Sequence, residues 1–169
     1  MFSYWEETPG VHSSKGATTI LGTSEVRPNA LMMIEPACGG RVTVSDDDLL
    51  IGVPELIVEF AKTNESVELN AKYHLYEWAG VAEYVVVLPQ QRTVRWFVRE
   101  ADGYHQLNAN DGVLKSRKFP GLWLTPEDLF VDNPRGLTTT LKLGLAQPEH
   151  ALFVERLERM KSPRRMPNQ

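Results

Sequence analysis

The amino-acid sequence predicts an α/β protein built on a mixed β-sheet with flanking helices. Residues 54–61 form a short apolar run with the length and β-branched content of a strand buried in a sheet. A helical pattern follows and ends at Gly80. Residues 81–88 then predict a second buried strand, so strand, helix and strand make one crossover unit. The residues on one face of the predicted helix are Leu69, Lys72, Tyr73 and Tyr76.

Shorter elements are predicted on both sides of this unit. Residues 1–7 resemble the last turn of a helix, and residues 35–53 are expected to form a loop. Residues 26–34 are a stronger strand prediction, with Pro28 near the start, where proline is tolerated. Further short strands are predicted at residues 11–14, 17–21, 93–99, 103–107 and 112–116.

The C-terminal part is predicted to be helical. Thr125 is expected to cap a short helix that has Pro126 at its first position. Two longer helices are predicted from about residue 134 to 145 and from about 148 to 160. We expect residues 1–160 to form a single domain and the basic residues 161–169 to form a disordered tail.

The composition is that of an ordinary soluble globular protein, with 169 residues, 42% hydrophobic and 24% charged. There is no signal peptide and no apolar run long enough to span a bilayer, so no membrane association is expected. Cys38 is the single cysteine, which excludes an internal disulfide and indicates a cytoplasmic protein. Its place beside Gly39 favours a loop residue over a nucleophile.

Several function classes find no support in the sequence. The net charge of −4 argues against a protein that coats nucleic acid non-specifically, but it does not exclude a nuclease, whose site is acidic until metal binds. There is no zinc-ligand cluster, phosphate loop, dinucleotide fingerprint or serine-nucleophile motif. The acidic residues 46–48 are expected to lie in a solvated loop.

Two charged residues in the crossover unit need an explanation. Glu59 interrupts a buried strand, where a carboxylate is costly unless it is paired or binds a metal. Lys72 lies on an otherwise apolar helix face, and Glu68 four residues earlier can pair with it. Two interpretations stay open: a purely structural pair of Glu59 and Lys72, or an active site.

Five segments, in order, carry a resemblance to a known family. The chain resembles the Uma-type putative restriction endonucleases, a bacterial branch of the PD-(D/E)XK nuclease superfamily, over nearly its whole length. Each motif is weak alone, but the ordered set with its spacing is specific. The segments are residues 27–30, 54–59, 72–76, 79–84 and 119–124.

The resemblance implies a restriction-endonuclease-like fold and a Mg²⁺ or Mn²⁺ cofactor held by two acids, with a lysine that orients the attacking water. Carried over, Glu59 is the second acid, and Asn29 stands in the place of the first acid. Lys72 matches the lysine that the family often has on the following helix. Glu68 stands where relatives carry Asp, and would orient Lys72.

The usual lysine position of the superfamily, two residues after the second acid, holds Ala61 here. Lys62 is one residue too late and would point to the opposite face of the strand. The lysine of a site in this chain is therefore expected on the helix.

The resemblance implies an endonuclease that hydrolyses phosphodiester bonds in DNA, weakened or inactive because Asn29 brings no negative charge. The alternative is a non-catalytic relative that binds DNA or a protein partner through the same fold. Enzymes that cut both strands are often homodimers. The family's N-terminal helix is missing, so truncation is expected to expose Phe2, Tyr4 or Trp5. The remaining large aromatic residues, Tyr84, Trp96 and Trp123, are expected in the core rather than as base-stacking platforms.

Overall fold

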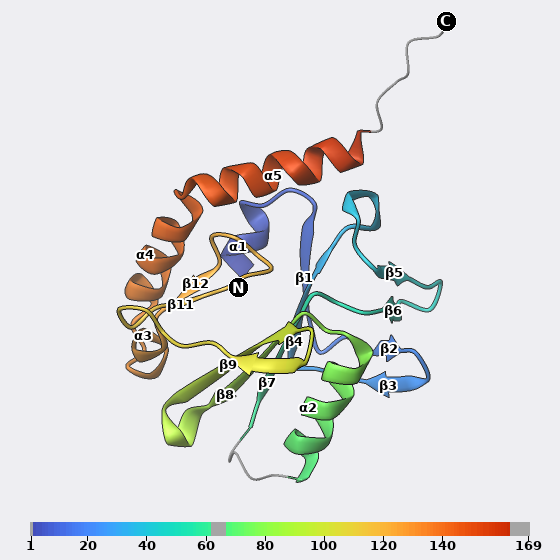
Figure 1. Cartoon of the computed structure of the whole chain (residues 1–169), viewed down its shortest axis with the longest axis horizontal. Helices are drawn as coiled ribbons and strands as arrows, with labels where there is room; N and C mark the ends of the chain where they lie inside the picture. Colours follow the sequence, from blue (N-terminus) through green and yellow to red (C-terminus); the bar gives the residue numbers. More distant parts are fainter. Residues whose placement is uncertain (1, 62–66, 163–169) are drawn as a thin grey trace, which may run out of the picture.

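A computed structural model describes residues 2–61 and 67–162, although the side chains of residues 2, 3, 67 and 68 lie outside the description. Its centre is a six-stranded mixed sheet, in which β7 and β8 are parallel and all other neighbours are antiparallel (Figure 1). Helix α2 (Val67–Ala79) connects the two parallel strands. The α/β prediction and the crossover unit are therefore confirmed. The strands in spatial order are β1 (Val11–Lys15), β4 (Ala30–Ile34), β7 (Leu56–Phe60), β8 (Glu83–Leu88), β9 (Thr93–Glu100) and β10 (Gly103–Gln106).

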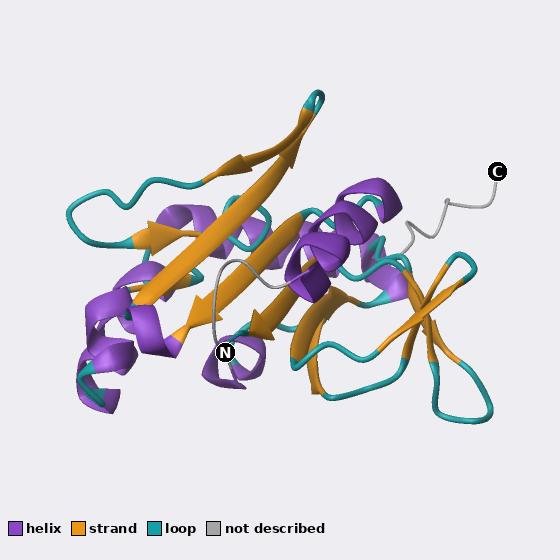
Figure 2. Ribbon diagram, turned by 90° about the horizontal axis from the view of Figure 1, so that it is seen from below, coloured by secondary structure: helices purple, strands orange, loops and turns teal. Residues whose placement is uncertain are grey.

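A second, four-stranded sheet lies beside the first (Figures 1 and 2). The prediction of a loop over residues 35–53 is wrong, because this stretch contains the 3-10 helix η1 (Pro36–Cys38) and two of the four strands. The expected acidic loop, residues 46–48, is the exposed connection between those strands. In spatial order the sheet contains β3 (Ser24–Val26), β2 (Thr19–Leu21), β6 (Leu50–Gly52) and β5 (Val42–Val44).

The strand predicted over residues 26–34 is broken in the structure. Val26 ends β3 in the small sheet, and Ala30 begins β4 in the large one. Pro28 lies in the link between them, where its missing N–H removes a ladder hydrogen bond. Asn29 therefore lies at the entrance to β4 rather than inside a strand.

The two faces of the large sheet carry different helices. Helix α2 packs on one face, and four helices contribute to the core on the other face (Figure 1). Thr125 precedes the third helix as predicted, but its hydroxyl lies 2.8 Å from that of Thr140 and makes no cap, so the capping prediction is wrong. The four helices are α1 (Phe2–Glu6), α3 (Pro126–Phe130), α4 (Pro134–Leu145) and α5 (Pro148–Lys161). A two-stranded ribbon, β11 (Leu114–Lys115) and β12 (Trp123–Leu124), lies against α4.

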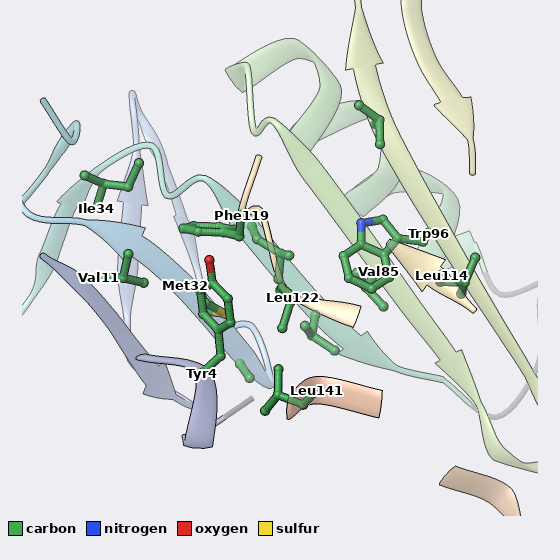
Figure 3. Packing of buried hydrophobic residues seen from close by; sticks show 14 of the residues in the cluster. Tyr4, Val11, Met32, Ile34, Val85, Trp96, Leu114, Phe119, Leu122 and Leu141 are labelled. Carbon is green, nitrogen blue, oxygen red and sulfur yellow. The ribbon is translucent and has the colours of Figure 1, made fainter. Parts of the chain in front are cut away.

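Two hydrophobic cores result. The first core lies between the sheet and helices α1, α4 and α5, with Trp96 and Phe119 buried in it (Figure 3). The second core lies under α2 and the small sheet, and includes Tyr76 and Tyr84. Trp96 and Tyr84 are therefore core residues as expected. Trp123 is half-buried, with the Lys115 ammonium 3.9 Å from the centre of its ring.

The expected apolar patch at the N-terminus is not found at Tyr4. Tyr4 is fully buried, and its hydroxyl donates to the Pro120 carbonyl at 2.8 Å. Trp5 is half-buried against the first core, while the side chain of Phe2 lies outside the described residues. Among the described helices, none has the length and apolar character needed to cross a bilayer. The predicted tail beyond Ser162 also lies outside the description.

Candidate active site

Glu59 lies near the C-terminal end of β7, on the face of the sheet that α2 covers. Its side chain is 5% exposed. The Lys72 ammonium lies 3.1 Å from its Oε1 atom, and the Tyr76 hydroxyl donates to the same oxygen at 2.8 Å. Lys72 and Tyr76 are four residues apart on α2, so one helix face supplies both groups. The buried carboxylate is thereby paired as its desolvation requires.

Tyr76 was assigned to the core from its sequence pattern, and its contact with the carboxylate was missed. Its position four residues after Lys72 is the signal that could have indicated the contact. Burial raises the pKa of Tyr76 far above its usual value, and the neighbouring charge of Glu59 acts in the same direction. The phenol therefore stays protonated and acts as a fixed donor to Glu59.

Asn29 lies just before β4, near Glu59. Ala30 pairs with Val58 in the antiparallel register, so the preceding residue Asn29 lies at the same end of the sheet as Glu59. The amide oxygen of Asn29 accepts a hydrogen bond from the Phe60 backbone N–H at 2.8 Å. This bond fixes the amide at the end of the sheet where β4 begins and β7 ends.

The structure thus brings Asn29, Glu59 and Lys72 to one end of the sheet. The predicted contact between Glu59 and Lys72 is present. The Glu68 side chain and Lys62 lie outside the described residues. The catalytic roles of all these residues remain predictions.

The donor set can be compared with the needs of a divalent cation. The Glu59 carboxylate and the Asn29 amide oxygen are hard oxygen ligands, the type that Mg²⁺ and Mn²⁺ prefer. The charge is less suitable, because Asn29 is neutral and the Lys72 ammonium balances the single carboxylate. The residues fit the cation in ligand type, with one anionic ligand fewer than a pair of acids would give.

Two other buried acids, Glu55 and Glu83, lie at the opposite end of the sheet, where β7 and β8 begin. Glu83 accepts four hydrogen bonds, two from side chains and two from backbone N–H groups, and so anchors the loop after β11 to β8. Burial raises the pKa of Glu83, and each of the four donors acts to lower it. Glu55 accepts from the Ile34 N–H at 2.8 Å. Both acids satisfy backbone groups, which indicates a structural role. The four donors to Glu83 are Trp96 Nε1, Ser116 Oγ and the backbone N–H groups of Arg117 and Lys118.

A third group of ligands lies on the surface of the β9–β10 hairpin. Glu100, Asp102 and His105 are exposed, and their ligand atoms lie within 4.8 Å of one another. His105 already pairs with Asp102 at 2.7 Å, and Glu100 pairs with Arg117 at 2.7 Å. This cluster is balanced by its own ion pairs, so it is not a candidate active site.

A hollow of about 340 Å³ opens on the other face of the sheet, between β8 and helix α4. Among the described residues, its lining is apolar apart from Lys15 and Thr138, and it contains no carboxylate. It lies on the side opposite to the Glu59 carboxylate. The candidate site is therefore the polar end of the sheet, not this hollow.

Comparisons with known proteins found a matching family model and a similar solved structure. A family model described as "Uma2: Putative restriction endonuclease" matches residues 6–127, which is more than half of the chain. The solved structure of a putative nuclease belonging to DUF820 from Anabaena variabilis is similar, with a TM-score of 0.59 and 15% identity. The match covers 76% of this chain and 73% of that one. At this identity the likeness shows the fold alone. A search of curated proteins found no match.

Proposed function

The chain belongs to the Uma2 family of putative restriction endonucleases, and from this premise we propose that it is a metal-dependent nuclease that hydrolyses DNA phosphodiester bonds. The observation that carries the proposal is the pairing of Glu59 with Lys72 at 3.1 Å, at the sheet end where Asn29 also lies. An acid and a lysine held together beside an oxygen ligand on a neighbouring strand form the arrangement that metal-assisted phosphodiester hydrolysis uses.

Each side chain has a distinct role in this proposal. Glu59 and Asn29 would hold Mg²⁺ or Mn²⁺, which when bound supplies a hydroxide nucleophile and neutralises charge on the phosphate. Lys72 orients the attacking water. The role expected for Glu68 concerns a side chain outside the described residues. Tyr76 holds one oxygen of the Glu59 carboxylate, which fixes the direction of the other oxygen.

Asn29 is expected to limit the activity. One unit charge about 4 Å from another contributes about 4 kcal/mol at an effective dielectric constant near 20, and a dication doubles this term. Hydration offsets much of it, but the missing carboxylate still corresponds to a large loss of metal affinity. We therefore expect weak Mg²⁺ binding and slow cutting by the chain as it stands.

The Asn29 hydrogen bond also favours a second candidate function. Its amide oxygen accepts from the Phe60 N–H, so the residue holds two strand ends together without any metal. A non-catalytic relative that binds DNA or a protein partner through the same fold would retain this bond.

We also propose that residues 1–160 form one domain. Because enzymes that cut both DNA strands are often dimers, we also propose a homodimer.

Calorimetric titration with Mg²⁺ or Mn²⁺ and a supercoiled-plasmid assay test the proposal. The proteins are the unmodified chain, Asn29→Asp, and Asn29→Asp with Glu59→Gln. Asn29→Asp restores a charge at nearly constant shape, so metal affinity and cutting should both rise, and the added Glu59→Gln should abolish both. Robust cutting that survives Glu59→Gln would place the chemistry elsewhere. If Asn29→Asp binds metal but never cuts, the second candidate function would be favoured.

A further inference from the structure

A lateral row of residues extends from the candidate site across the sheet. Glu59 pairs with Val86 in the parallel register of β7 and β8, and Val86 pairs with Arg95 in the antiparallel register of β8 and β9. Directly paired residues have their side chains on the same face. Arg95 therefore emerges on the Glu59 face, about 10 Å away, since neighbouring strands are about 4.8 Å apart.

The packing around the row agrees with this placement. Val86 lies in the second core together with Tyr76, the partner of Glu59. Phe97, two residues after Arg95 on β9, packs edge-on against Tyr73 of α2, with ring centres 5.1 Å apart. Arg95 thus lies on the α2 face, further towards the sheet end where Glu59 is found.

Arg95 differs from most arginines of this protein in its surroundings. Its guanidinium makes no hydrogen bond or ion pair with any described residue, although Arg95 is half-buried. By contrast, Arg92 and Arg99, on either side of it in the sequence, each donate to a backbone carbonyl. A guanidinium that has no counter-charge among the described residues keeps all its donors for an anionic ligand.

We infer that Arg95 binds a backbone phosphate of the DNA strand whose reacting phosphate lies at Glu59. The inference rests on the proposed function, and adds to it a phosphate-binding residue outside the family motifs. A guanidinium donates two parallel hydrogen bonds to phosphate oxygens, which fixes the strand as well as attracting it. Arg95 would thereby align the strand along the row from β9 to β7.

The test is the binding of a fluorescein-labelled 20-base-pair duplex, measured by anisotropy in EDTA from 50 to 200 mM NaCl. The proteins are the unmodified full chain, Arg95→Gln, Arg95→Lys and the control Arg135→Gln. Arg135 is exposed on α4, on the other face of the sheet, and its loss changes the net charge equally. Cutting of plasmid by the same variants in the Asn29→Asp background is measured in parallel.

Arg95→Gln should weaken duplex binding about tenfold at 50 mM salt, and should reduce the slope of log affinity against log salt by about 0.9. Arg95→Lys keeps the charge, so it should retain the slope and recover part of the affinity. Arg135→Gln should change neither. A purely structural role for Arg95 would lower the melting temperature and leave the slope unaltered.

The outcomes separate this inference from the proposed function. Equal binding by Arg95→Gln and Arg135→Gln would overturn the inference, even if Asn29→Asp cuts plasmid. A selective loss in Arg95→Gln would support it, even if no variant cuts and the nuclease proposal fails. If the unmodified chain does not bind the duplex at any salt concentration, the inference is overturned, and plasmid cutting by Asn29→Asp with metal decides the proposed function separately.

Discussion

The ion pair between Glu59 and Lys72 makes a quantitative prediction for stability. The two side chains are 5% and 25% exposed, and their charged atoms are 3.1 Å apart. At that distance and an effective dielectric constant near 20, the attraction is about 5 kcal/mol before the cost of desolvation. Removing one partner of a buried pair costs about 3–5 kcal/mol. Because Lys72 is partly exposed and Tyr76 still donates, we expect Lys72→Met to cost about 2 kcal/mol.

A double-mutant cycle isolates the interaction. Glu59→Gln keeps a hydrogen-bond acceptor for Tyr76 and lets Lys72 turn to solvent, so it should cost about 1 kcal/mol. The double variant should cost less than the sum, which gives a coupling energy of about 1 kcal/mol. Urea unfolding at pH 7, followed by circular dichroism, gives the free energy of unfolding of all four proteins. The control is Lys142→Met on the exposed side of α4, whose free energy of unfolding should lie within about 0.5 kcal/mol of that of the unmodified chain. Additivity of the two single changes within about 0.3 kcal/mol would refute the pairing as an energetic interaction.

Three further predictions concern other parts of the fold. Glu83→Gln turns an amide N–H₂ towards a site where four groups donate. It should lower the free energy of unfolding, measured in urea, by about 2–3 kcal/mol. A change below about 0.5 kcal/mol, on the order of a surface substitution, would contradict the anchoring role. Burial lowers the pKa of His150, so the folded chain binds the proton less readily than the unfolded chain. The unfolding free energy should therefore fall as the pH drops below about 6.5, and this part of the fall should be absent in His150→Gln when both are measured from pH 7 to 5. Gly40→Ala would place its Cβ against the Ile34 carbonyl oxygen, whereas the Cβ of Gly22→Ala meets open space and that variant bears only the cost of a left-handed backbone. Gly40→Ala should therefore lower the melting temperature markedly more than Gly22→Ala. Equal shifts would contradict the steric reasoning.

The elements that the sequence predicts well are those with long patterns. The apolar runs of β7 and β8 and the 13-residue helix between them each contain enough positions for a period to be recognised. The sequence predicts β2 of the small sheet within residues 17–21 but not β5 and β6, because strands of three residues hold barely one alternation. Because β3 is so short, the sequence predicts one strand over residues 26–34, although Pro28 separates β3 from β4.

The candidate site could be predicted in part for a similar reason. Glu59 and Lys72 are conspicuous because each interrupts an apolar pattern, and the helix spacing brings them together. Tyr76 shows no such interruption, so only its position four residues after Lys72 indicates its hydrogen bond to Glu59. The positions of Asn29 and Arg95 relative to Glu59 depend on strand register, which the pairing of residues far apart in the sequence decides.

The parallel pairing of β7 with β8 has a consequence for the order of folding. Strands β8, β9 and β10 are joined by short turns, so their contacts close small loops and can form early. The pair of β7 and β8 begins with Leu56 against Glu83, and can close only after the intervening helix has crossed over. We therefore expect β7 to join late, with Glu59 making few native contacts in the transition state. Substitutions at Glu59 should then speed unfolding and leave the refolding rate almost unchanged, so the lifetime of the folded chain would depend on the same carboxylate as the proposed chemistry.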